Sequence, residues 1–227
     1  MTQPPSNVSV FYLLLLIIFN QFAYPFTEVG GASLIAYQCG YAAMFLVSVF
    51  IPEVGRAHVV VTGVSALVFF GFSLLDALGP QEAWRDAAVF GSILPFQASV
   101  VVALFRLVFS RPRVTAEVIY AAVSIYLLLG ALFVPLYGTL EVFSPGAFVD
   151  TLRPDEDVAW QQLIYFSYVS LTTLGFGDIL PASGWARSFV SLEAVVGVLY
   201  LAILMARLVS LYGQTWLPER EDENDED

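Results

Sequence analysis

Long apolar runs separated by short polar breaks occupy most of the chain. An α-helix needs about 20 apolar residues to cross the hydrocarbon core of a bilayer, because each residue adds about 1.5 Å. By this measure the pattern predicts six membrane-spanning helices. Their predicted bounds are Val8–Phe26, Ala32–Ile51, Ala57–Leu78, Ala87–Phe109, Val118–Tyr137 and Ala186–Tyr212.

The segment between the last two runs does not fit a spanning helix. A polar, acidic stretch from Gly138 to Asp157 is followed by Ala159–Thr172, which is apolar and aromatic. As a helix, that second segment has only about three or four turns. It is too short to span, so we expect a re-entrant helix. The pattern as a whole predicts an all-α membrane protein.

Composition agrees with this fold class. Of 227 residues, 58% are hydrophobic and 13% are charged, and the mean hydropathy is +0.76. The formal net charge is −11, but residues 219–227 hold seven acids against Arg220, so the acidity is largely local. We expect residues 214–227 to be an acidic disordered tail. No basic patch favours nucleic-acid binding. No nucleophile motif, histidine–carboxylate cluster or metal-ligand spacing favours an enzyme, so no catalytic residue is predicted.

The arginines predict the orientation in the membrane. With six spans, one side receives most of them and the other side three. Because basic residues favour the cytoplasmic side, both termini are expected in the cytoplasm of a cell-membrane protein. The richer side holds Arg56, Arg106, Arg111, Arg113, Arg207 and Arg220, and the poorer side Arg85, Arg153 and Arg187.

A glycine-containing motif follows the re-entrant segment, at Thr173-Leu174-Gly175-Phe176-Gly177. Glycine accepts positive φ without steric cost. A backbone that alternates between ordinary and mirror-image conformations can turn successive carbonyls the same way. Rows of carbonyls from several chains form oxygen cages that replace the water shell of an ion.

This motif resembles the selectivity filter of the tetrameric potassium channels, whose usual form is T-V-G-Y-G. Leu174 and Phe176 replace the usual valine and tyrosine. Residues 113–213 resemble the pore domain of that family, with an outer helix, a pore helix, the filter and an inner helix. The resemblance implies a homotetramer in membrane lipid with no organic cofactor. It also implies that K⁺ ions bind to the oxygens of Thr173, Leu174, Gly175 and Phe176, with Gly177 completing the filter.

The resemblance assigns supporting roles to neighbouring residues. Thr172 ends the pore helix, whose negative end would face the membrane centre and favour a cation. Asp178 would bond behind the filter, with Tyr165 in the place of the usual tryptophan.

Two residues of the last span also stand out. Glu193 is the one charge deep in that span, and an intramembrane carboxylate usually faces a polar partner. We expect it to face the pore helix near Ser170 or Thr172. Gly197 lies where the family often has a glycine that bends at the gate. The sequence does not decide whether Gly197 is a gating hinge or a site of close helix packing.

Residues 1–110 are predicted to form a four-helix transmembrane domain that packs beside its own pore module. Six spans with the pore last resemble the plan of voltage-gated channels. Voltage sensing needs roughly three or four moving charges per subunit, and the fourth run offers only Arg106, near its end. The domain is therefore not expected to be a conventional voltage sensor.

The leading functional hypothesis is a passive potassium-selective channel. A weakly selective monovalent cation channel is an alternative, because Leu174 and Phe176 depart from the usual filter. A non-conducting membrane subunit or a transporter would be a different class. A transporter would be expected to show inverted repeats and paired broken helices, which the sequence does not contain.

Overall fold

The computed structural model describes residues 6–29, 32–51, 55–78 and 83–215, and these are mostly helical, as predicted. Two three-residue strands lie near the last two long helices. The elements are α1 (Ser6–Phe22), the 3₁₀ helix η1 (Tyr24–Val29), α2 (Ala32–Ser48), α3 (Arg56–Leu78), α4 (Ala83–Ser110), α5 (Ala116–Phe143), β1 (Phe148–Asp150), α6 (Trp160–Leu171), β2 (Ile179–Pro181) and α7 (Gly184–Thr215).

Four helices are long and apolar enough to cross a membrane. Their spanning segments are Arg56–Leu75, Trp84–Ser110, Ala116–Phe143 and Gly184–Ser210. The first two predicted spans correspond to shorter helices, because α1 and α2 have 17 residues each. That length is about 26 Å, slightly less than the roughly 30 Å hydrocarbon core. The prediction of six spans is therefore supported directly for four of them.

The predicted end of the first span at Phe26 is wrong. α1 stops at Phe22, and the chain continues as η1. Pro25 has no amide hydrogen with which to continue the α-helical ladder, so the change to a 3₁₀ turn follows from the sequence. At the other end of the chain, α7 includes residues 214 and 215. The rest of the predicted acidic tail lies outside the described residues.

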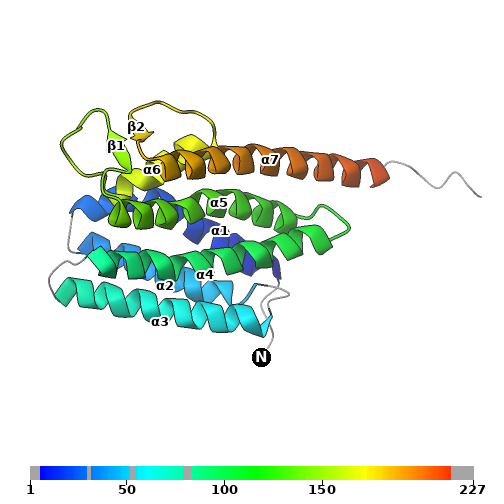
Figure 1. The fold of residues 1–227 in the computed structure, drawn as a ribbon. Coiled ribbons are helices and arrows are strands. Elements are labelled where there is room, and N and C mark those ends of the chain that lie inside the picture. Colours follow the sequence, from blue (N-terminus) through cyan, green and yellow to red (C-terminus); the bar gives the residue numbers. More distant parts are fainter. Residues whose placement is uncertain (1–5, 30–31, 52–54, 79–82, 216–227) are drawn as a thin grey trace, which may run out of the picture.

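The long helices lie side by side, with α7 at one edge and α3 at the other (Figure 1). α5 is central, because it packs against α1, α4, α6 and α7. The first turn of α1 and the last turn of α7 lie at one end of the bundle, and α6, β1 and β2 lie at the opposite end (Figure 1).

The segment predicted as a polar loop from Gly138 to Asp157 is partly ordered secondary structure. α5 continues to Phe143, and β1 pairs antiparallel with β2, with Val149 opposite Leu180. The Glu141 carboxylate accepts the amide hydrogens of Gly146 at 2.6 Å and Phe148 at 3.0 Å. This carboxylate therefore holds the turn between α5 and β1.

Arg207 fastens the C-terminal part of α7 to the end of α4. Its guanidinium donates to the carbonyls of Val108 at 2.5 Å and Arg111 at 3.0 Å and lies 4.4 Å from the centre of the Phe109 ring. The last carbonyls of a helix have no donor within the helix, so a basic side chain there acts as a cap. The contact joins α7 to α4 of the same chain.

Candidate ion-binding site

The backbone between α6 and β2 alternates in handedness. φ is +58° at Thr173, +58° at Gly175 and +79° at Gly177, and Leu174 and Phe176 between them keep ordinary negative values. This is the alternation that the two glycines predict. Thr173 is the only residue other than glycine with positive φ in the described part of the chain. Such strain in a non-glycine residue is held in place only by its surroundings and is typical of functional sites.

The amides of this loop are tied to the end of α6. Thr173 donates to the Ser170 carbonyl at 2.9 Å, and Leu174 donates to the Val169 carbonyl at 2.9 Å. The Thr172 hydroxyl donates to the Tyr168 carbonyl at 2.7 Å. These bonds use carbonyls at the end of α6 that have no partner within the helix. They fix the start of the loop to the negative end of the helix dipole.

The carbonyls of the same loop are left without partners. Within the described residues, no hydrogen bond ends on the carbonyl oxygens of Thr173, Leu174, Gly175 or Phe176. All four residues are exposed on the single chain. Exposed backbone acceptors that are paired neither by secondary structure nor by side chains are accessible to water or to an ion. This row of oxygens is therefore a candidate ligand set for a cation.

Asp178 holds the C-terminal end of the loop. Tyr165, on α6, donates its phenol hydrogen to Asp178 Oδ2 at 2.6 Å, and the Ile179 amide donates to Oδ1 at 3.0 Å. The contact between Tyr165 and Asp178 is the one that the resemblance to the potassium channels implies. The rings of Tyr165 and Phe176 are parallel within 3°, with centres 6.4 Å apart. Thr151, just after β1, donates its amide hydrogen to the Asp178 carbonyl at 2.7 Å.

Glu193 joins three helices at one buried point. Its side chain is fully buried, and its two oxygens accept hydrogen bonds from Tyr137 of α5 and Ser167 of α6, each at 2.5 Å. The prediction that Glu193 faces α6 is confirmed, but the expected neighbours Ser170 and Thr172 are wrong. Gly197 packs at Leu171, and α6 and α7 run in the same direction here. One turn earlier on each helix, Glu193 therefore meets Ser167.

Gly197 is needed for this close approach. A Cβ atom at this position would lie 2.4 Å from the Leu171 carbonyl oxygen, which is less than any real contact. The structure thus gives Gly197 a packing role against the end of α6. Its role as a hinge stays a prediction.

Two contributors to the site were not singled out from the sequence, namely Tyr137 and Ser167. Each is a hydroxyl within an apolar helix, and either could have been proposed as a partner of a buried acid. Which hydroxyl contacts Glu193 depends on how α6 crosses α7, and no local sequence pattern gives that crossing.

Replacing Glu193 tests this buried junction. In Glu193→Leu the Tyr137 hydroxyl has no acceptor, and an unpaired buried donor costs about 1–3 kcal/mol. We expect a lower midpoint of thermal unfolding for the detergent-purified protein, and a smaller decrease for Glu193→Gln, which keeps one acceptor oxygen. Glu156→Leu, at an exposed position, is the control. Unchanged midpoints in both Glu193 variants would contradict the structural role of this carboxylate.

Comparison with known proteins matches the same part of the chain. Residues 121–214 match a family model described as an ion channel. The chain is 32% identical over 84 residues to the potassium channel protein kcv of Paramecium bursaria Chlorella virus 1, covering 36% of this chain and 84% of that protein.

Two plant proteins match over nearly the same length. The chain is 35% identical over 85 residues to the two pore potassium channel c of Oryza sativa subsp. japonica. It is 30% identical over 84 residues to the two-pore potassium channel 4 of Arabidopsis thaliana. Each match covers 37% of this chain but only 17% and 30% of the rice and Arabidopsis proteins. No solved structure matches the chain significantly.

Proposed function

The chain is a member of the potassium-channel superfamily, and from this premise we propose that it conducts K⁺ passively through four copies of Thr173–Gly177 arranged around one axis. It is an integral membrane protein, and its family is one of ion channels rather than of enzymes. The oxygens of Thr173, Leu174, Gly175 and Phe176 are the proposed K⁺ ligands.

The row of unpartnered carbonyls is the observation that carries this proposal. A dehydrated ion needs oxygens on all sides, and one chain supplies a single row. The same residues are exposed on the isolated chain, so they are accessible to neighbouring copies. α7 supports an assembly as well, because most of its apolar residues are exposed on the single chain, including Val195, Val198, Ile203 and Met205. A homotetramer would place the four rows around the ion.

We further propose that α1 and α2 also cross the membrane, giving six spans with both termini in the cytoplasm of a cell-membrane protein. The two ends of the described bundle support this orientation. The first turn of α1 and the last turn of α7 share one end, and α6 lies at the other (Figure 1). An even number of spans produces this arrangement, and the arginine distribution assigns the first end to the cytoplasm.

Flux measurements on the purified protein in liposomes test the proposed function. We expect rapid flux under a K⁺ gradient, little flux under a Na⁺ gradient, and block by Ba²⁺. Equal flux of both ions would favour the weakly selective cation channel instead. Absence of flux in vesicles that contain assembled protein would favour a non-conducting subunit, and flux that depends on a second coupled solute would favour a transporter.

Neutralising Arg106 tests the expectation that the four-helix domain is not a conventional voltage sensor. Arg106 is exposed near the end of α4, and the only other arginine of that helix, Arg85, is in its first turn. One charge crossing the whole membrane contributes only about 2.3 kcal/mol per 100 mV. We expect the slope of the conductance–voltage relation to be the same in Arg106→Gln as in the wild type. Arg113→Gln serves as the control, and a shallower slope confined to Arg106→Gln would contradict the expectation.

The acid sensitivity of the K⁺ current tests the hydrogen bond between Tyr165 and Asp178. The hydrogen bond from Tyr165 lowers the pKa of Asp178 below its ordinary value, and the same bond raises the pKa of Tyr165 to about 12. Because the native pKa of Asp178 lies below the unperturbed value near 4, the ionised carboxylate stabilises the folded filter loop at any pH above that value. This stabilisation is lost as the pH falls through the lower native pKa.

Without the phenol, Asp178 takes up its proton at a higher pH. We therefore expect the midpoint for loss of K⁺ current in acidic outer solution to move to higher pH in Tyr165→Phe. Tyr120→Phe, which removes a phenol far from Asp178, is the control and should leave the midpoint unchanged. A midpoint in Tyr165→Phe equal to that of the wild type would show that this bond does not hold the filter.

A further inference from the structure

The C-terminal end of the filter loop is attached to β1 as well as to α6. Thr151, the residue after β1, donates to the Asp178 carbonyl oxygen twice, from its amide at 2.7 Å and from its hydroxyl at 2.9 Å. The same hydroxyl lies 3.5 Å from the Gly177 carbonyl oxygen. A carbonyl oxygen has two lone pairs, so Thr151 satisfies that of Asp178 completely.

The Phe176 carbonyl, one of the proposed K⁺ ligands, has no attachment of its own. Within the described residues, no hydrogen bond ends on it and none begins at the Phe176 amide. The Phe176 side chain has no polar group, and its ring is 64% exposed and stacks on Tyr165. Because the peptide group between Phe176 and Gly177 is planar, this carbonyl turns whenever Gly177 turns. Its direction therefore depends on how firmly Asp178 is held.

A buried carboxylate joins β1, and with it Thr151, to the first turn of α6. Asp150, the last residue of β1, is only 7% exposed. Its Oδ2 accepts a hydrogen bond from the Gln162 side chain at 2.8 Å, and its Oδ1 accepts the Leu152 amide hydrogen at 2.8 Å. The Gln162 side chain also accepts the Ala159 amide hydrogen at 2.8 Å. Hydrogen bonds to an ionised group are stronger than those between neutral groups, so this junction fixes the end of β1.

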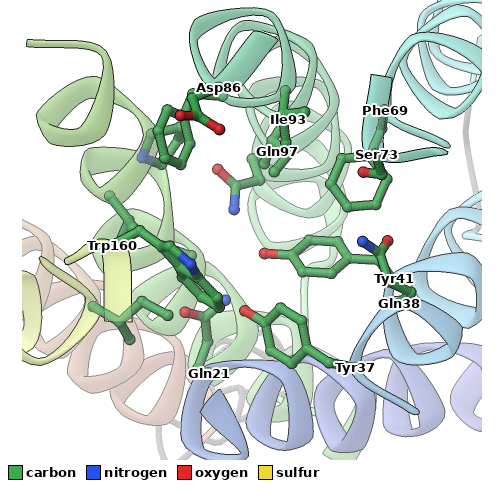
Figure 2. Close-up of a pocket in the computed structure, with 16 residues that line it drawn as sticks. Gln21, Tyr37, Gln38, Tyr41, Phe69, Ser73, Asp86, Ile93, Gln97 and Trp160 are labelled. Atoms are coloured by element: carbon green, nitrogen blue, oxygen red, sulfur yellow. The ribbon is translucent and has the colours of Figure 1, made fainter. Parts of the chain in front are cut away.

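The first turn of α6 is also placed against the four-helix domain. Trp160 and Tyr37 of α2 have ring centres 5.5 Å apart. Both side chains line a cavity of about 220 Å³ whose wall comes from α1 to α6 (Figure 2). Residues two positions apart on a helix point to different sides. The start of α6 therefore contacts α2 through Trp160 and β1 through Gln162.

We propose that Thr151 is a positioning residue for ion selection. Its two hydrogen bonds to Asp178 keep the Phe176 carbonyl directed at the bound ion. Asp150 and Gln162 keep Thr151 in place. Selectivity depends on the size of the oxygen cage or on the number of carbonyls around the ion, and a Phe176 carbonyl that turns away changes both. This role rests on the proposed function, because it requires that the loop conducts K⁺.

The ratio of Na⁺ to K⁺ permeability, obtained from reversal potentials of the full-length channel in lipid bilayers, tests the proposal. Thr151→Val keeps the amide and the side-chain shape but lacks the hydroxyl. We expect it to raise the ratio about fivefold, the factor that corresponds to one lost hydrogen bond of ordinary strength. Thr151→Ser keeps the hydroxyl and should retain the wild-type ratio. Ser144→Ala is the control, because it removes an exposed hydroxyl that makes no hydrogen bond within the described residues.

Gln162→Glu tests the second attachment. When ionised, the new carboxylate still accepts the Ala159 amide hydrogen, but it has no hydrogen to donate to Asp150, and the two carboxylates repel each other. We expect the permeability ratio to rise as in Thr151→Val. Gln161→Glu adds the same charge at the neighbouring residue, which does not contact Asp150, and should leave the ratio unchanged. Equal ratios in these two variants would contradict the role of the junction.

The outcomes separate this role from the proposed function. A K⁺-selective wild type whose permeability ratio is unchanged in Thr151→Val would overturn the role of Thr151 alone, whereas a wild type without preference for K⁺ would overturn both. Reversal potentials do not depend on the number of channels, so poor assembly does not imitate the expected effect. An equal rise in Thr151→Ser would also overturn the role, because that variant retains the hydroxyl.

If Thr151→Val carries no current, binding of K⁺ to the purified protein decides the question. K⁺ that binds the folded channel raises the midpoint of thermal unfolding. We expect Thr151→Val to need about fivefold more K⁺ than the wild type for half of that rise, by the same hydrogen-bond arithmetic. A midpoint that is lower by the same amount at every K⁺ concentration would show a purely structural role for Thr151 and would overturn the proposal.

Discussion

Gly175→Ala is expected to abolish the K⁺ flux of the channel, whereas Gly146→Ala leaves the flux near that of the wild type. Both glycines have positive φ, +58° and +80°, and a Cβ atom at either would meet nothing within 4 Å. Steric contact within one chain therefore does not distinguish them. The difference is that the carbonyl of Gly175 belongs to the proposed ligand row and that of Gly146 does not.

The expected magnitude follows from backbone strain. Left-handed conformation costs about 1–2 kcal/mol for a residue with a side chain. In a homotetramer the substitution occurs four times around one ring of oxygens, so the strain is about 4–8 kcal/mol in total. Relief of that strain turns the carbonyl away from the axis. The measurement is K⁺ flux per assembled tetramer, and flux in Gly175→Ala equal to that in Gly146→Ala would contradict the assignment of the filter.

Gly197→Ala is expected to cause the second large loss of K⁺ flux. Gly184→Ala, on the same helix, is its control. A Cβ atom at Gly197 would lie 2.4 Å from the Leu171 carbonyl oxygen, and one at Gly184 would meet nothing within 4 Å. The obstructing atom is backbone at the end of α6, so the clash cannot be relieved by a side-chain rotation. Overpacking of this kind costs about 1–3 kcal/mol per site.

The same variant separates packing from hinge bending at Gly197. If close packing dominates, Gly197→Ala lowers the midpoint of thermal unfolding as well as the K⁺ flux, because α6 and the attached filter loop must shift. If Gly197 serves only as a hinge, the midpoint is unchanged and only the fraction of open channels falls. We expect the first result. An unchanged midpoint with normal flux would contradict both roles.

Local patterns in the sequence predicted the parts of the fold that depend on local chemistry. The last four predicted spans became long apolar helices, with ends that differ from the predicted bounds by at most six residues, at the end of α5. A continuous apolar run of that length has few alternatives in a membrane. The positive φ values at Gly175 and Gly177 followed from the two glycines, whereas the positive φ at Thr173 did not. Tyr165 and Asp178 were paired through the resemblance to a known family, and the structure contains that hydrogen bond.

Features that depend on tertiary geometry were not predictable in this way. The strands β1 and β2 have three residues each, too few for an alternating pattern to stand out. The partner of Glu193 depended on how α6 crosses α7. The cap provided by Arg207 joins residues almost a hundred positions apart, and the cavity takes its wall from six helices. Each of these requires contacts between segments that carry no mutual signal in the sequence.

The position of bound ions tests the central claim most directly. Crystals of the assembled channel grown with Rb⁺, a K⁺ substitute with a strong anomalous signal, would locate them. We predict a row of anomalous peaks on the fourfold axis, each surrounded by oxygens of Thr173, Leu174, Gly175 and Phe176 from all four chains, and no such row when Rb⁺ is replaced by Na⁺. A loop that faces away from any shared axis, or an axis without peaks in Rb⁺, would contradict the account.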